Sequence, residues 1–285
     1  MAHSLKHHGG TPMSLGIVFK GPEGIVLAAD SRVTLMHQLV GGPLLPATFD
    51  NTTKLLRING QDYVGAVTYG LGAIGERNPR TAHSYIPEFE ASIKKRRLKV
   101  GEIAKRLGEF FMQRWKDQEM PKPEEWPPRP EMVFLLGGYD KGEPYGRVYE
   151  VGIPSRPDPK EWHESDFGPV WGGQQEFVGR LIHGYDPNLL SIVQKCLNLS
   201  EEQVTSLKKD LQTIQVGIPY QFLPLQDCIN LSTLLVRTTM EMQSFYVGLR
   251  GVGGNIDVAA ITKTGGFQPI KEKEVARLFN PRSAT

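Results

Sequence analysis

The sequence of 285 residues predicts an α+β fold in which two mainly antiparallel sheets lie face to face and a layer of helices covers each, a four-layer αββα sandwich. Strand-like and helix-like runs are grouped apart, in the order strands, two helices, strands, two or three helices, strands. Such grouping is typical of antiparallel sheets with helices on their faces. The helical stretches carry apolar residues at three- and four-residue spacing, so each has a face to bury against a sheet.

The composition is that of a globular chain with many loops. Hydrophobic residues make up 39% and charged residues 22%, with 31 glycines and 21 prolines, as in folded domains. The net charge of +2 gives no excess of cations for a nucleic-acid partner. No apolar run approaches the roughly 20 residues of a membrane span, and residues 1–10 lack the apolar core of a secretory signal. We expect a cytoplasmic protein with a leader over residues 1–10 and a single domain over residues 11–285.

The stretch from Gly9 to Thr34 predicts the first two strands. Two apolar β-type runs, over residues 15–19 and 25–29, flank the sequence KGPEG, whose glycines and proline favour a turn, so the pair predicts a β-hairpin. A hydroxyl residue, Thr11, precedes the first strand behind two glycines, and Asp30 closes the second strand. The pattern raises the hypothesis that Thr11 is a nucleophile exposed at a new N-terminus.

The rest of the chain predicts groups of strands and helices separated by loops rich in glycine and proline. Asn59-Gly60 is a strong turn signal for a second hairpin, and Ser200 with Gln203 resembles a capping box at the start of a helix. The five prolines of residues 121–130 exclude a helix there. The expected strands cover residues 54–58, 63–69, 132–136, 146–151, 169–171 and 256–262. The expected helices cover residues 85–93, 100–118, pieces of 174–214 broken at 184–187, 226–249 and 271–279. The expected loops cover residues 41–51, 153–165 and 217–224.

No residue pattern indicates a metal or a cofactor. Cys196 and Cys228 form neither a disulfide framework nor a metal-ligand spacing, and their apolar helical surroundings predict two buried free thiols. The histidines of the first ten residues have no neighbours that would fix a ligand geometry. We therefore expect neither a metal nor a cofactor.

Three stretches of the sequence resemble the β-type subunits of the proteasome and their bacterial relatives. They are GIVLAADSRVT at residues 24–34, TKLLRI with VTYGLGAIG at 53–58 and 67–75, and GGNIDVAAITKTGGFQPI at 253–270. The resemblance extends from Gly10 to about Ile270 and implies the αββα fold of the N-terminal-nucleophile (Ntn) hydrolases. It also implies a threonine-type endopeptidase within a ring of identical subunits, stacked rings, and an ATPase or other regulator as partner. The substrate would be a peptide or an unfolded polypeptide.

The resemblance also implies the roles of individual residues. Self-cleavage at Gly10-Thr11 would make Thr11 the N-terminal nucleophile, with Asp30 as the acid, Lys54 as the lysine beside it, and the backbone N–H of Gly70 at the oxyanion. The substrate side chain would lie against Val33, Thr68 and Gly72, whose modest size suggests room for a large apolar group. The chemistry is physically sound, because a free α-amino group titrates near pH 8 and can take the proton of a hydroxyl at neutral pH.

The sequence departs from the family pattern in two respects. Thr11 stands about three residues farther from its acid than the family's threonine does, which predicts a longer hairpin tip and a bulge between Thr11 and Gly16. The family's supporting serines and aspartate are replaced by Leu249, Arg250 and Val252, and by the turn of residues 171–174, which has no serine. Two other hypotheses therefore stay open, a structural subunit without peptidase activity and an Ntn amidohydrolase of small amides.

Overall fold

The computed structural model describes residues 14–38, 44–75, 78–93, 96–127, 129–186 and 188–273. The strands within these ranges are β1 Leu15–Lys20, β2 Ile25–Asp30, β3 Val33–Gln38, β4 Leu44–Phe49, β5 Leu55–Arg57, β6 Val64–Gly70, β7 Met132–Gly138, β8 Arg147–Ile153, β9 Arg156–Trp162, β10 Gly168–Gly173, β11 Ile256–Thr262 and β12 Gly266–Lys271. The helices are α1 Ala82–Ser92, α2 Val100–Asp117, α3 Gln175–His183, α4 Leu189–Leu197, α5 Glu201–Thr213 and α6 Leu225–Ser244, with single 3₁₀ turns at Pro123–Glu125 and Tyr220–Phe222.

Two five-stranded sheets form the centre of the fold. The first has the order β10-β1-β2-β11-β12 and the second the order β5-β6-β7-β8-β9, while β3 and β4 form a separate two-stranded ribbon. Every strand pair in these sheets is antiparallel. The α+β class with antiparallel sheets is therefore confirmed, and so are the two predicted hairpins, β1–β2 and β5–β6.

Three apolar clusters separate the layers of the structure. One lies between the two sheets and contains Leu27, Val67 and Leu135 among others. A second lies between the second sheet and helices α1 and α2. A third lies between the first sheet and helices α3 and α6. Alternation explains this division, since Ile17 and Val18 of the same strand enter different clusters, as neighbouring side chains of a strand point to opposite faces.

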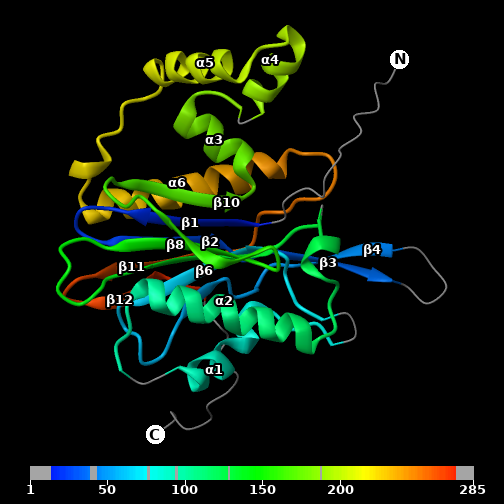
Figure 1. Cartoon of the computed structure of the whole chain (residues 1–285), viewed down its shortest axis with the longest axis vertical. Helices are drawn as coiled ribbons and strands as arrows, with labels where there is room; N and C mark the ends of the chain where they lie inside the picture. Colours follow the sequence, from blue (N-terminus) through cyan, green and yellow to red (C-terminus); the bar gives the residue numbers. More distant parts are fainter. Residues whose placement is uncertain are drawn as a thin grey trace, which may run out of the picture.

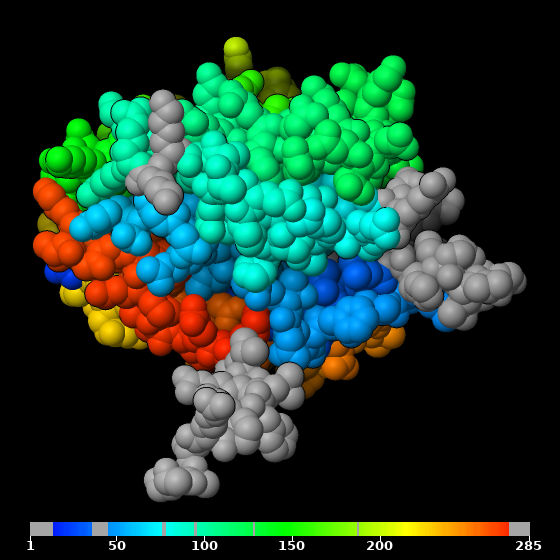
Figure 2. Space-filling model, turned by 90° about the horizontal axis from the view of Figure 1, so that it is seen from below, coloured from blue at the N-terminus to red at the C-terminus, as the bar shows by residue number. Residues whose placement is uncertain are grey.

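The views of the molecule show how these layers are arranged. The two sheets lie one above the other, with α1 and α2 below them and α3 and α6 above (Figure 1). From below, α1 and α2 cover much of this face, and the edge of the first sheet with β12, in red, lies beside them (Figure 2). Helices α4 and α5 lie farthest from the sheets (Figure 1), and neither of them has a buried residue.

Two segments predicted as loops form strands. Residues 156–162, within the proline-rich stretch, make β9, which the prediction missed because Pro157 and Pro159 argue against a strand. Prolines are tolerated at the edge of a sheet, where no further strand needs their N–H groups, and β9 is an edge strand. Most of the predicted loop at residues 41–51 lies in β4, whose sequence LLPATF contains a proline and no alternation of apolar and polar residues, so the pattern did not reveal a strand.

The other differences concern the helices and one cysteine. The last long helix ends at Ser244 rather than near residue 249, and Cys196 is exposed while Cys228 is buried, so the prediction of two buried thiols was wrong for Cys196. The capping box is confirmed, because Ser200 Oγ accepts from Gln203 N at 3.3 Å and Ser200 N donates to Gln203 Oε1 at 2.8 Å. The tail helix expected from residue 271 falls mainly outside the described residues, and β12 includes Lys271.

Candidate active site

Asp30, the last residue of β2, is fully buried and accepts four hydrogen bonds. Oδ1 accepts from the backbone N–H of Leu15 at 2.9 Å and from Lys54 Nζ at 2.7 Å. Oδ2 accepts from the backbone N–H groups of Gly253 at 3.0 Å and Arg32 at 3.1 Å. An ionised carboxylate can accept about four hydrogen bonds, so these donors match a charged Asp30. The carboxylate thereby joins its own segment to those of Leu15, Lys54 and Gly253.

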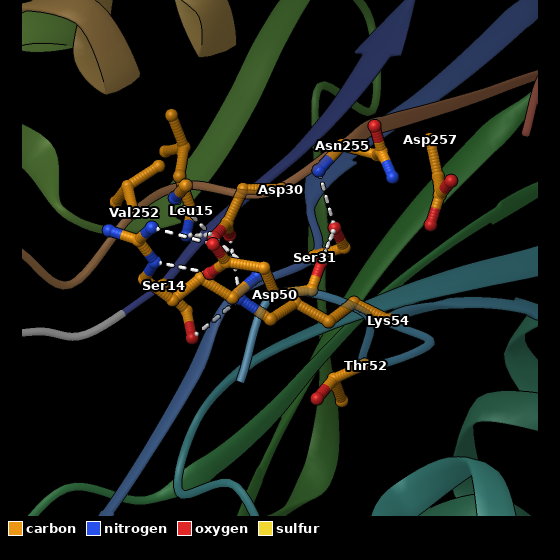
Figure 3. A network of polar contacts seen from close by, with 12 residues as sticks. Ser14, Leu15, Asp30, Ser31, Asp50, Thr52, Lys54, Val252, Asn255 and Asp257 are labelled. Carbon is orange, nitrogen blue, oxygen red and sulfur yellow. Dashed lines mark hydrogen bonds and ion pairs between the residues drawn. The ribbon is translucent and has the colours of Figure 1, made fainter. Parts of the chain in front are cut away.

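Lys54 precedes β5 and directs its ammonium group between Asp30 and Ser14. Its Nζ lies 2.7 Å from Asp30 Oδ1 and 3.0 Å from Ser14 Oγ, so that the three side chains form a continuous chain of contacts (Figure 3). Burial lowers the pKa of Lys54, while the neighbouring Asp30 carboxylate acts in the opposite direction and Lys273 adds to the lowering. Lys54 is only 4% exposed, so its charge interacts with its neighbours with little screening by solvent.

Ser14 lies immediately before β1 and is the hydroxyl residue that the structure brings to Lys54. Its backbone carbonyl accepts from Gln174 N at 2.8 Å, which holds it against the end of β10. The β1–β10 register runs from Leu15 opposite Gly173 without a shift, so the bulge predicted between Thr11 and Gly16 is absent from Ser14 onwards. Thr11, the predicted nucleophile, lies outside the described residues.

Gly70 ends β6 beside this group. Thr68 N donates to Lys54 O at 3.0 Å, and successive N–H groups along a strand alternate in direction, so the N–H of Gly70 points to the same side as that of Thr68. β5 begins only at Leu55, which leaves this side of Gly70 open toward the site. Gly70 has φ +85°, and a Cβ there would lie 2.0 Å from the carbonyl oxygen of Glu131, so the backbone here requires glycine.

A small pocket of about 20 Å³ lies beside Ser14 and Lys54, and the three residues predicted to contact substrate line it, but it has no room for the large apolar group that their size suggested. The lining includes Ser14, Lys54, Gly70, Val33, Thr68 and Gly72. A Cβ on Gly72 would lie 2.6 Å from Val33 Cγ2, so the Val33 side chain occupies the space that the missing side chain of Gly72 leaves. Thr68 Oγ1 is buried and has no hydrogen-bond partner among the described residues, which gives the pocket a polar group.

A second network holds the two segments that carry Asp30 and Lys54. Arg32 Nε and Nη2 donate to the two oxygens of Asp50 at 2.6 and 2.9 Å. Ser31 Oγ donates to Asp50 O at 2.6 Å and accepts from Asn255 N at 2.7 Å. These contacts tie the end of β2 to the loop before β5 and to the loop before β11, as Figure 3 shows. Bidentate pairing and backbone contacts restrict the movement of both segments.

The loop of residues 249–253 takes part in the site through its backbone. Gly253 N donates to Asp30, and Gly253 O accepts from Ser31 N at 3.1 Å. Val252 is buried in the apolar cluster beneath α6, and its N–H donates to Gln243 Oε1 at 2.8 Å. At the positions where the family pattern has supporting polar groups, Leu249 and Val252 are apolar, and Arg250 contributes its carbonyl oxygen, which accepts from Arg32 Nη1 at 3.4 Å.

Ser14 is the residue that the sequence interpretation missed. It stands 16 residues before Asp30, whereas Thr11 stands 19 residues before it. The excess of about three residues, attributed above to a longer hairpin tip and a bulge, was the available signal, because Ser14 follows Thr11 by three residues.

Neither protein-family models nor curated protein sequences gave a match to this chain. Within the described ranges, no cluster of three or more His, Cys, Asp or Glu side chains is arranged to bind a metal ion. None of the helices in those ranges reaches the length and hydropathy of a membrane-spanning segment.

Proposed function

We propose that this chain is an amide hydrolase of the Ntn type, with Ser14 rather than Thr11 as its nucleophile. The observation that carries the proposal is the contact chain from Ser14 Oγ through Lys54 Nζ to the buried carboxylate of Asp30, at the edge of a pocket that also contains Gly70. A hydroxyl beside an ammonium group, with a backbone N–H nearby, is an arrangement suited to acyl transfer.

The mechanism requires Ser14 to carry a free α-amino group. This group is formed when the Met13–Ser14 bond is cut, for example when Ser14 Oγ attacks the carbonyl carbon of Met13, the C–N bond breaks, and water hydrolyses the resulting ester. The amine is then close to the hydroxyl of its own residue and can act as its base.

In each catalytic cycle, Ser14 Oγ attacks the substrate carbonyl carbon as the α-amine takes the hydroxyl proton. The ammonium of Lys54 favours the neutral, basic form of the amine and stabilises negative charge, while Asp30 keeps Lys54 charged and oriented. The N–H of Gly70 donates to the oxyanion, a contribution of about 3–4 kcal/mol for a single such donor. The protonated amine gives its proton to the leaving nitrogen, and water then hydrolyses the ester.

The layered architecture supports a finer assignment. The αββα arrangement and the three resembling stretches together favour a proteasome-like subunit, which would act on peptides inside a ring of identical chains. The side chain before the scissile bond would lie at the pocket lined by Val33, Thr68 and Gly72, which would have to widen to admit a large one.

The experiment that tests the proposal is the intact mass of the purified protein, followed by labelling with a β-lactone, which acylates activated hydroxyls. We expect a mature chain that begins at Ser14 and one acyl group on that residue. Ser14→Ala should abolish labelling, and Lys54→Met should slow it by about 10²–10⁴-fold. Labelling of a chain that begins at Thr11, or labelling that survives in Ser14→Ala, would show that Ser14 has been misassigned.

The second candidate is a subunit that assembles without hydrolytic activity. The observation that favours it is the loop of residues 249–253, which supplies backbone groups but no serine or aspartate side chain. In that case the chain would assemble at full length, and the β-lactone would not react with it.

A further inference from the structure

Gln174 stands opposite Ser14 where β10 ends and α3 begins. Its backbone N–H donates to Ser14 O at 2.8 Å, and the register places Gly172 opposite Gly16 two positions further along. Opposite residues of an antiparallel pair have their side chains on the same face. A Cβ on either Gly16 or Gly172 would meet the ring of Tyr69, so this face is the one between the sheets, where Ser14 Oγ meets Lys54.

The side chain of Gln174 is buried beside Ser14 with an unused acceptor. The residue is 6% exposed, and its Oε1 has no hydrogen-bond partner among the described residues. The Nε2 atom lies 3.5 Å from Glu176 Oε2, a long contact. A buried acceptor without a donor costs about 1–3 kcal/mol, and functional groups are one of the recognised reasons for such an atom.

We infer that Gln174 Oε1 accepts a hydrogen bond from the α-amino group of Ser14 and positions this amine as the base of the reaction. The inference rests on the proposed function, because the amine exists only after the bond before Ser14 is cut. The N–H and C=O of one residue in an antiparallel strand point to the same side. Since Ser14 O faces Gln174, the nitrogen of Ser14 faces it too.

A hydrogen bond from one N–H of the amine would fix the direction of the amine lone pair. The lone pair can then point at Ser14 Oγ, and the proton moves from Oγ to nitrogen as the Oγ–carbon bond forms. A neutral carboxamide suits this position because it accepts a hydrogen bond without adding a charge. A carboxylate there would favour the protonated amine, which cannot act as a base.

The ionisable groups around residue 174 are already paired with other groups or are uncharged. Lys54 and Asp30 face it from their own segments and compensate each other at 2.7 Å. Glu176 on α3 is paired with Arg180 at 2.9 Å, and Tyr69 on β6 keeps its proton because burial raises its pKa. A carboxylate introduced at residue 174 would act on the amine, and its second neighbour, the carboxylate of Glu176, is already paired with Arg180.

The test measures the rate of β-lactone acylation of mature protein against pH for the wild type, Gln174→Glu and Gln174→Met. The acid limb of the profile, where the rate falls as the amine becomes protonated, reports the pKa of the Ser14 amine. For Gln174→Glu we expect this limb to move to higher pH by about one unit or more, as for an opposite charge within a few ångströms. For Gln174→Met, which keeps the length of the side chain without its acceptor, we expect an acylation rate about tenfold lower on the plateau and an acid limb at slightly lower pH.

Two controls separate the possible outcomes. Thermal unfolding and the mass of the mature chain show whether each variant is folded and processed, and Gln226→Glu on the exposed surface of α6 controls for an added charge. An acid limb that stays in place in a folded, processed Gln174→Glu, while acylation still depends on Ser14, would overturn the role of Gln174 alone. A wild-type protein that is not acylated at Ser14 would overturn both this role and the proposed function.

Discussion

Replacing Asp30 should destabilise the protein much more than replacing Lys54, although the two residues form one ion pair. Asp30→Ala removes the acceptor of three backbone N–H groups, the buried ones of Leu15 and Gly253 and the partly buried one of Arg32, and leaves the ammonium of Lys54 buried without its carboxylate. Breaking a buried pair in this way costs about 3–5 kcal/mol. We expect the free energy of unfolding to fall by about 4 kcal/mol.

Lys54→Met leaves Asp30 with its three backbone donors and fills most of the volume of the lysine side chain. The remaining cost is the two hydrogen bonds of the ammonium, to Asp30 Oδ1 and Ser14 Oγ, and the counter-charge of Asp30. The three backbone donors that still solvate the carboxylate and the burial of an apolar side chain offset much of it, and we expect a loss of about 1–2 kcal/mol. The difference between the two variants is then about 2–3 kcal/mol. In a domain of this size, that difference corresponds to melting temperatures that differ by about 4–10 °C.

The two variants also predict different dependences of stability on pH. Burial lowers the pKa of Lys54 below its ordinary value of 10.5, so the unfolded chain binds more protons than the folded chain between the lowered pKa and about 10.5. The free energy of unfolding should therefore rise with pH through this window. Lys54→Met should remove that rise.

Urea unfolding followed by tryptophan fluorescence measures both effects, with melting temperatures from calorimetry as a second readout. Asp50→Ala is the matched control, because it removes a carboxylate that pairs with Arg32 but lies partly exposed at the surface. Its loss should be smaller than that of Asp30→Ala. Equal losses for Asp30→Ala and Lys54→Met would refute the reasoning, since they would show that the ion pair, and not the backbone donors, accounts for the stability that Asp30 provides.

Three further predictions concern other parts of the molecule. Val33→Ala should enlarge the pocket above Gly72 and shift cleavage of a peptide library toward larger side chains by about tenfold, and an unchanged preference would place the specificity pocket elsewhere. Iodoacetamide at pH 8 should alkylate exposed Cys196 and spare Cys228, because burial raises the pKa of Cys228 to about 11; peptide mapping checks this, and equal modification would contradict it. Ser200→Ala should destabilise α5 locally by about 1 kcal/mol through loss of the cap, seen as faster amide exchange confined to that helix, whereas unchanged exchange would show that the cap contributes nothing.

The parts of the fold that the sequence predicted are those set by local chemistry. The β1–β2 hairpin was predicted because its turn and its apolar runs lie within one short stretch, and α2 because its apolar residues recur on one face. β9 was missed because the tolerance of a strand for proline depends on its place at the edge of the sheet. β9 is at the edge because β8 pairs with it on one side and no other strand of the described chain adds to its other side, which no local pattern of residues can show.

The residues of the candidate site likewise divide into those that a local sequence pattern predicted and those that it did not. Asp30, Lys54 and Gly70 each belong to a stretch with a recognisable order of residues, and the structure brings all three to one place. Ser14 and Gln174 have no such stretch around them. Their relation is a matter of register between β1 and β10, which are about 150 residues apart in the sequence, and a register between distant strands is fixed by the packing of both faces.

Asp30 contributes both to the stability of the fold and to the proposed chemistry, whereas Lys54 contributes mainly to the chemistry. The carboxylate binds backbone groups from both ends of the chain, Leu15 and Gly253, so the strands that it holds together are the strands that place Ser14. Its lysine partner makes fewer structural contacts and reaches the nucleophile directly. Selection for a stable fold alone accounts for the backbone contacts of residue 30 but gives little reason to bury an ammonium beside a serine, since replacement of a whole buried ion pair by apolar side chains is often neutral or stabilising. The presence of Lys54 therefore argues for the hydrolase over the purely structural subunit.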